Sequence, residues 1–193
     1  MEVSQNLWNL KPIFRKSKAF TILELILTLG LSSVLILSLL SIFNYSKHVS
    51  FLGNEIDELM LNGRYALEFI KDEVRAAEKI VPTSKIKGLN GAYKDNLGFV
   101  IINKEDEILN RFTTYYLKNG KLIRISGLAK NDSYPIYSQL QGHNEISEYI
   151  HSIEDSGLDI EGKMIYLSFK LLSDSGQDIN FKSSIYIRCP IEN

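Results

Sequence analysis

The sequence predicts an α+β protein: a long N-terminal helix, membrane-spanning in its first half, packed against a C-terminal antiparallel β-sheet head. Three observations lead to this prediction. Residues 19–43 form an apolar run with one charged residue, Glu24. An amphipathic pattern then continues to Pro82, and short alternating runs follow it. Because a helix repeats every 3.6 residues and a strand every two, this change of period marks a change of secondary structure.

Length and composition limit the function classes. The chain has 193 residues, which gives room for one domain of ordinary size. It has 22 basic and 23 acidic residues, a formal net charge of −1, which argues against a nucleic-acid binder held by bulk positive charge. Cys189 is the only cysteine, so an intrachain disulfide and a Cys-rich zinc site are excluded.

The apolar run is long enough to cross a membrane. At about 1.5 Å per residue, a helix over residues 19–43 spans a bilayer core of about 30 Å. The weakly polar residues within it carry hydroxyls that can bond back to helix carbonyls. Against the single acid Glu2, the preceding segment carries several basic residues: Lys11, Arg15, Lys16 and Lys18. The positive-inside rule therefore places the N-terminus in the cytoplasm and the chain after Tyr45 outside.

Glu24 is the unusual residue of this run. A carboxylate within an apolar span costs roughly 2.5–3.5 kcal/mol on insertion scales and usually marks a function. Glu24 follows Phe20 by one helical turn, so a free α-amino group on Phe20, in the same chain or a neighbour, would be a natural countercharge. Snorkelling of Glu24 to the headgroups is the alternative. The run is too long for an ordinary secretory signal peptide, and a plain signal anchor stays open.

The segment around Glu24 also carries a family resemblance. Residues Lys16 to Leu25, KSKAFTILEL, resemble the processing motif of type IV prepilins and type II secretion pseudopilins. In that family a membrane peptidase removes a short basic leader and methylates the new N-terminal amine, and the fifth mature residue is Glu. The resemblance implies cleavage between Ala19 and Phe20, N-methylation of Phe20, an assembly role for Glu24, and a basic leader with Arg15, Lys16 and Lys18. Ala19 stands where the family usually has Gly.

Two further segments, 63–77 and 113–124, look like J-type minor pseudopilins and related minor pilins. The amphipathic pattern of the first continues the apolar helix, with apolar residues three or four apart from Leu52 to Ala77. The resemblance and the pattern together divide the chain into four segments: a cleaved leader at 1–19, a transmembrane and filament-core helix at 20–45, its amphipathic continuation at 46–81, and a β-rich head at 82–193.

Within the head, one turn has a strong signature. Asn119-Gly120 predicts a two-residue hairpin because both positions need a positive φ, and such a turn pairs Leu117 with Leu122 and Tyr116 with Ile123. Strands are expected at 97–103, 111–118, 121–126, 164–172 and 178–189, with another within 148–160.

No catalytic motif is present. The sequence lacks a nucleophile elbow, a P-loop and a dinucleotide-binding glycine motif. His143 and His151 are interpreted as solvated rather than as a metal pair, and the acidic run 103–107 as a solvated turn rather than a calcium site. Cys189 is interpreted as a small buried hydrophobe rather than an intermolecular disulfide partner. The chain is therefore expected not to be an enzyme and to need no cofactor or metal.

The resemblance implies a minor pilin or pseudopilin that assembles into, or primes, a type IV pilus or a type II secretion pseudopilus. Its expected partners are other pilin or pseudopilin subunits, the prepilin peptidase, the inner-membrane assembly platform and the membrane, with no direct nucleic-acid contact. It would be a single-pass cytoplasmic-membrane protein with an extracytoplasmic head, and later part of a cell-surface or periplasmic filament. Two alternatives stay open: a membrane-anchored binding or sensor module, and a competence pilin for DNA uptake.

Overall fold

The computed structural model describes residues 20–131 and 133–192. The predicted leader 1–19, including Ala19, Arg15, Lys16 and Lys18, lies outside the described residues. The chain forms two compact units, which meet in the sequence between His48 and Val49. Each unit is described by itself below.

Helix α1 (Ile22–Arg75) has 54 residues and runs through the division between the units. Its second part is amphipathic, as predicted. The buried residues recur every three or four positions, which gives one apolar stripe along the helix. They are Leu59, Gly63, Ala66, Leu67, Ile70 and Val74.

The helix ends earlier than the boundary at 81 that the periodicity predicted. Helical structure stops at Arg75, and Lys79–Pro82 form strand β1. This strand pairs antiparallel with β2 (Phe99–Lys104), with Ile80 opposite Ile101. Ile80 and Val81 are buried, and β-branched residues suit a pleated, buried surface better than a helix end. A short 3-10 turn η1 (Thr83–Lys85) and the single-turn helix α2 (Leu89–Ala92) follow.

The first sheet has five antiparallel strands in the order β1-β2-β3-β4-β5. β3 (Leu109–Lys118) and β4 (Lys121–Lys130) form the predicted hairpin. The predicted register is confirmed, with Leu117 opposite Leu122 and Tyr116 opposite Ile123. Asn119 and Gly120 have φ angles of 52° and 75°, as the two-residue turn requires. β5 (Gly142–Ser147) follows the 3-10 turn η2 (Tyr137–Gln139) and forms the far edge.

The second sheet has four strands around a central β8 (Met164–Leu172). The short strands β6 (Ile150–Ser152) and β7 (Gly157–Asp159) pair with one side of β8. The region 148–160, where one strand was expected, therefore contains these two short strands. β9 (Asp178–Tyr186) pairs with the other side of β8 and ends before the expected residue 189.

The second unit, called the head from here on, comprises residues 49–131 and 133–192 of the described chain and so includes the end of α1. It has two apolar clusters on opposite faces of the first sheet. Phe99, Ile101 and Tyr115 join the buried stripe of α1 and the inner face of the second sheet, including Leu167 and Phe169. The other face of β2 and β3 packs against η1 and α2, through residues that include Val81, Ile86, Leu89, Val100, Ile102 and Phe112. A long N-terminal apolar helix packed against antiparallel sheets is an α+β, pilin-like architecture, which confirms the predicted fold class.

Candidate assembly helix and its anchorage

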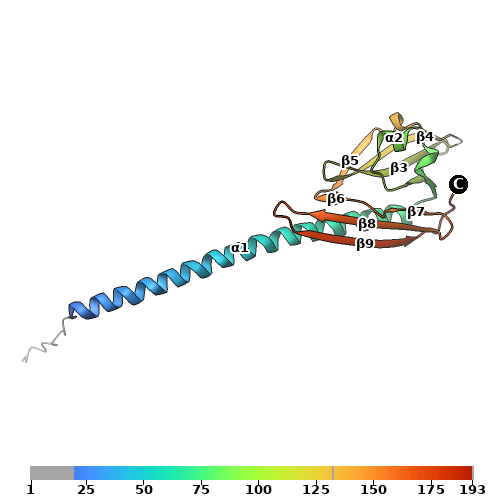
Figure 1. Ribbon diagram of the computed structural model, residues 1–193. Coiled ribbons are helices and arrows are strands. Elements are labelled where there is room, and N and C mark those ends of the chain that lie inside the picture. Colours follow the sequence, from blue (N-terminus) through green and yellow to red (C-terminus); the bar gives the residue numbers. More distant parts are fainter. Residues whose placement is uncertain (1–19, 132, 193) are drawn as a thin grey trace, which may run out of the picture. The chain divides into compact units, whose positions relative to one another are not determined.

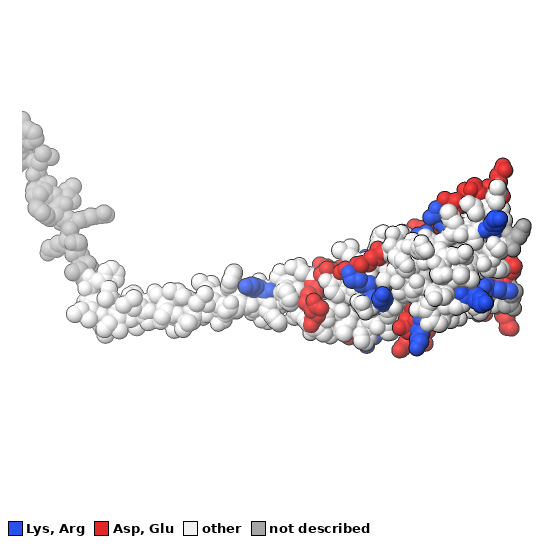
Figure 2. All heavy atoms as spheres, turned by 90° about the horizontal axis from the view of Figure 1, so that it is seen from above, with Lys and Arg blue, Asp and Glu red and all other residues white. Residues whose placement is uncertain are grey.

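The first part of α1 is apolar and uncovered. One helix of the described chain, α1, is long and apolar enough to cross a membrane. Its large apolar side chains from Ile22 to Phe43 are 52–80% exposed. Figure 2 shows this segment as a nearly uncharged surface, while the Lys, Arg, Asp and Glu side chains gather on the other unit. Exposing such a surface to water is costly, and a surface of this kind is typical of a segment that contacts lipid or other helices.

Four hydroxyl groups inside this segment are satisfied by the helix itself. Thr28 donates to the Leu25 carbonyl at 2.9 Å, and Ser33 donates to the Gly30 carbonyl at 2.7 Å. Ser38 and Ser41 donate in the same way, at 2.8 Å and 3.0 Å, to carbonyls one turn earlier. These bonds let the segment carry hydroxyls in an apolar environment without unpaired donors.

Glu24 and Thr21 together cap the start of α1. The Thr21 carbonyl accepts the first helical bond, from the Leu25 N–H at 3.1 Å, which makes Thr21 the N-cap residue. The Thr21 hydroxyl oxygen accepts the Glu24 N–H at 3.2 Å. The Glu24 carboxylate in turn accepts the Thr21 N–H at 3.0 Å and its hydroxyl at 3.1 Å. This reciprocal arrangement is a capping box.

The capping box gives Glu24 a local role beside the predicted one. Two donors that would otherwise be unpaired at the helix start are satisfied, and the N-terminal end of the helix dipole favours the negative charge. The side chains of Phe20, Thr21 and Glu24 are all exposed, so Glu24 remains accessible to an ammonium group of a neighbour. The predicted cleavage position at Ala19 lies outside the described residues.

Within the head, a carboxylate on α1 ties the helix to the central hairpin. Glu73 is bound by Arg124 of β4, at 2.9 Å and 3.1 Å from the Nε atom and at 2.8 Å from a terminal nitrogen. The Tyr115 hydroxyl of β3 donates to the same carboxylate. The side chains of Arg124 and Glu73 are only 12% and 22% exposed. Burial, together with the charge of Glu73, raises the pKa of the Tyr115 hydroxyl.

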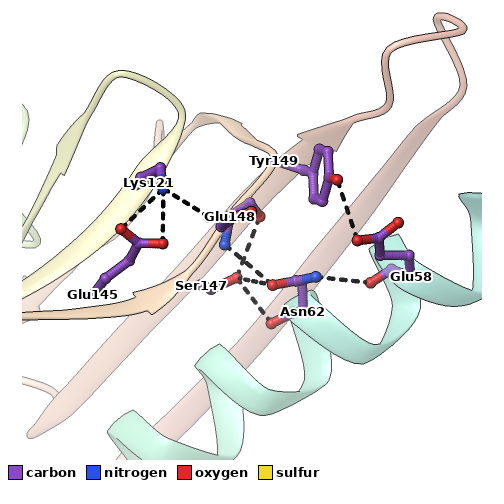
Figure 3. A network of polar contacts seen from close by, with 7 residues as sticks. All are labelled: Glu58, Asn62, Lys121, Glu145, Ser147, Glu148 and Tyr149. Atoms are coloured by element: carbon purple, nitrogen blue, oxygen red, sulfur yellow. Dashed lines mark hydrogen bonds and ion pairs between the residues drawn. The ribbon is translucent and has the colours of Figure 1, made fainter.

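A second polar network joins α1 to the crossover between the two sheets (Figure 3). Asn62 lies at its centre. Its amide group donates to the Glu58 carbonyl at 3.1 Å, and its side-chain oxygen accepts the Glu148 N–H at 3.1 Å. The Ser147 hydroxyl donates to the Asn62 carbonyl at 3.1 Å. The crossover backbone is therefore held directly by the helix.

Side-chain bonds on either side of Glu148 also stabilise this crossover, one from Tyr149 to α1 and one set from Lys121 of β4. Tyr149 adopts a positive φ of 63°, which is unfavourable for a residue with a side chain. Its hydroxyl donates to Glu58 at 3.1 Å, and this bond raises the pKa of Tyr149. Lys121 binds Glu145 at 2.9 Å and Glu148 at 2.6 Å. These bonds raise the pKa of Lys121 to about 12, and the bond from Lys121 lowers the pKa of Glu148.

Of the other residues considered for chemistry, His143 and His151 are both exposed, and the rest have partners within the chain. The His143 ring lies against Tyr116 and Tyr93. In the acidic run, Glu105 binds Arg111 at 2.7 Å and 2.8 Å, and Asp106 accepts the N–H groups of the turn. Cys189 is partly buried, not fully buried as expected; it packs against the larger apolar cluster, and burial raises the pKa of its thiol. Among residues 20–131 and 133–192, no group of three or more His, Cys, Asp or Glu side chains is placed to hold a metal ion.

Sequence reasoning missed the capping box and the Asn62 network. The capping box was readable, because Thr21-Ile22-Leu23-Glu24 has the Thr-x-x-Glu pattern directly before an apolar run. The Asn62 network had no local signal, since Ser147 lies 85 residues from Asn62 in the chain. No family model, curated protein or solved structure matches the chain.

Proposed function

We propose that this protein is a minor pilin or pseudopilin, a structural subunit that assembles into, or primes, a type IV pilus or a type II secretion pseudopilus. In this proposal a prepilin peptidase cuts between Ala19 and Phe20 and methylates Phe20. The apolar part of α1 lies in the cytoplasmic membrane before assembly and in the filament core afterwards. The head is extracytoplasmic, and the protein has no enzymatic activity of its own.

One observation carries the proposal: the same helix supplies an exposed apolar segment, an acidic residue in its first turn and the buried stripe of the head. A membrane anchor alone needs only the first of these. Filament assembly, as proposed, needs all three. The apolar segments must pack on one another, the acidic residue must set their register, and each head must stay attached to its own helix. The Glu73–Arg124 and Asn62 contacts support that attachment.

The role proposed for Glu24 is charge registry. A carboxylate in a water-excluding helix bundle is costly unless a positive group pairs with it. The methylated amine of Phe20 in a neighbouring subunit would be such a group. The capping box holds the Glu24 carboxylate at the start of the helix, which favours pairing with a group at the same level of the neighbour.

Glu24→Gln separates registry from capping. Glutamine can replace glutamate in a capping box but carries no charge. The assay measures incorporation into filaments sheared from cells that express a type II secretion or type IV pilus system with its prepilin peptidase. We expect Glu24→Gln to lower incorporation by about tenfold or more, as the loss of about 1.4 kcal/mol per contact would. Glu68→Gln, an exposed carboxylate later in the same helix, is the matched control.

Equal amounts of both variants in the membrane fraction show that the precursor is made and inserted. Under that condition, wild-type incorporation of Glu24→Gln would refute charge registry. The wild-type protein could instead be absent from filaments while the membrane fraction contains it with a folded head. That result would support the anchored binding or sensor module.

A further inference from the structure

β9 has an unpaired outer edge. Within residues 20–131 and 133–192, β8 is the one strand that pairs with β9. The pairing is continuous from Met164 opposite Tyr186 to Leu172 opposite Asp178, without a bulge. Figure 1 shows β9 as the outermost strand beside β8. A long regular edge of this kind presents a row of unsatisfied backbone groups to another chain.

The register identifies those backbone groups. The Ile187 N–H bonds the Lys163 carbonyl at 2.9 Å, so this opposite pair is of the hydrogen-bonded type. Antiparallel pairs alternate between bonded and non-bonded types. The odd-numbered residues of β9 therefore bond to β8. The N–H and C=O groups of Asn180, Lys182, Ser184 and Tyr186 point to the open edge.

The opposite case occurs in the first sheet, where the chain covers its own edge. The Ile80 N–H of β1 bonds the Pro190 carbonyl at 3.1 Å, and the Glu192 N–H bonds the Ile80 carbonyl at 3.1 Å. The C-terminal segment thus occupies the β1 edge. No equivalent segment of the described chain pairs with β9.

A cationic groove runs along the open edge on the helix side. Its volume is about 380 Å³. The groove is lined by three cations, Lys71 and Arg75 from α1 and Arg188 beyond β9, and by no carboxylate. Lys71 already pairs with Glu68 of the same helix at 2.8 Å. Hydroxyls from Ser183, Ser184 and Tyr186 complete the polar lining. The ion pair that Arg75 makes with Asp72 on the helix is long, at 3.4 Å, and largely exposed, so Arg75 can turn to another anion at little cost.

A second hollow lies on the outer face of the same strand positions. It has a volume of about 390 Å³ and is lined by residues that include Asp155, Tyr166, Lys182 and Ser184. Lys182 lies 3.8 Å from Asp155. Ser184 lies opposite Tyr166 across the strand pair. The small serine beside the large tyrosine leaves room for an incoming side chain. An added strand would place alternate side chains on the two faces, one set toward the groove and one toward this hollow.

We propose that the outer edge of β9 binds an extended, acidic segment of a partner protein by strand addition. Backbone bonds to Lys182, Ser184 and Tyr186 would provide the pairing, and carboxylates of the segment would face Lys71, Arg75 and Arg188. Charge selects this occupant over a second copy of the chain. In a two-fold pairing of one β9 edge with another, centred on Ser184 beside the groove, the groove cations of the two copies would be brought together. The inference concerns the head alone and does not rest on the proposed filament function.

The test uses the full chain in detergent micelles and a fluorescein-labelled peptide of about seven residues, the usual length of a strand. Glutamate and threonine alternate in the peptide, so all its carboxylates lie on one face. Two matched probes accompany it: the same peptide with lysine in place of glutamate, and the acidic peptide with alternate amide nitrogens methylated. Fluorescence anisotropy measures each dissociation constant.

Three protein variants complete the test. Ser184→Pro removes an N–H that points away from β8, so the existing pairing is kept. Arg188→Glu reverses one charge in the groove. Lys94→Glu reverses an exposed charge that lines neither hollow. We expect acidic-peptide binding to weaken about tenfold in Ser184→Pro and about fivefold in Arg188→Glu, and to stay within about twofold in Lys94→Glu. The lysine probe and the methylated probe should bind the wild type at least about tenfold more weakly.

Three results would overturn the proposal. The first is that the acidic peptide shows no preference over the lysine probe, either because both bind equally or because no probe binds at about 1 mM. The second is undiminished binding of the methylated peptide to the wild type, which tests strand addition even where Ser184→Pro fails to fold. The third is self-association of the chain that Ser184→Pro abolishes, because this would assign the edge to a second copy.

Discussion

Replacing Arg124 with methionine should destabilise the head more than the same replacement at a comparable surface pair. Methionine keeps most of the aliphatic length of arginine but removes the guanidinium. The Glu73 carboxylate then loses its bonds at 2.8 Å, 2.9 Å and 3.1 Å. It keeps the Tyr115 hydroxyl as a donor and remains inside a largely buried site.

The size of the effect follows from burial. Removing one partner of a buried ion pair costs about 3–5 kcal/mol, because the remaining charge is left unpaired. Glu73 is 22% exposed and keeps one donor, which lowers the expectation to about 2–4 kcal/mol. For a domain of this size, about 2–4 °C of Tm corresponds to each kcal/mol. The Tm should therefore fall by about 4–16 °C.

Arg111→Met is the matched control. Arg111 binds Glu105 with equally short distances, 2.7 Å and 2.8 Å, but these side chains are 39% and 38% exposed. Exposed pairs contribute about 0–1 kcal/mol. Thermal and urea unfolding of the full chain in micelles, followed by near-ultraviolet circular dichroism, gives the change in Tm and in the free energy of unfolding for each variant. The double variant Glu73→Gln, Arg124→Met should recover at least about 1 kcal/mol, since no charge is left unpaired. Equal costs at Arg124 and Arg111 would refute the reasoning from burial.

Two further predictions test the packing of α1 and the crossover. Gly63→Ala should lower the free energy of unfolding in urea by about 1–3 kcal/mol, because an added Cβ would overlap the ring of Phe181. The control Gly53→Ala, with nothing within 4 Å of its added Cβ, should be neutral or stabilise by up to about 1 kcal/mol. A neutral Gly63→Ala would contradict the close approach of the helix to Phe181. The Tm difference between wild type and Lys121→Met should be constant from about pH 5 to about pH 10, because the lowered pKa of Glu148 and the raised pKa of Lys121, about 12, lie outside this window. Below about pH 4 that difference should shrink as Glu148 takes up a proton, and a difference that grows on acidification would contradict the network.

Local signals allowed much of the fold to be predicted. The 3.6-residue period of α1 and the Asn119-Gly120 turn each depend on residues close together in the chain. The turn even determines the pairing of Leu117 with Leu122, because a two-residue hairpin leaves one register. The apolar run around Glu24 is likewise a local feature, so the candidate segment was identified from composition and spacing.

Non-local pairing explains what the sequence did not reveal. Residues 76–81 continue the helical period, but Ile80 and Val81 pair with β2 instead, and that pairing depends on residues 100 and 101. The contacts of Asn62 with Ser147 and Glu148 join segments far apart in the chain. No pattern near Asn62 indicates them, because an asparagine on a helix is ordinarily solvated. The open edge of β9 is also a property of sheet order rather than of its own sequence.

The most direct test of the filament proposal is the N-terminal residue and intact mass of the protein purified from membranes, with and without a co-expressed prepilin peptidase. Ala19→Gly, which carries the residue usual at this position in prepilins, is the positive control for the peptidase. The account predicts a wild-type chain that begins at N-methylated Phe20 when the peptidase is present and at Met1 when it is absent. A wild-type chain that keeps Met1 beside a peptidase that cuts the Ala19→Gly chain would contradict it.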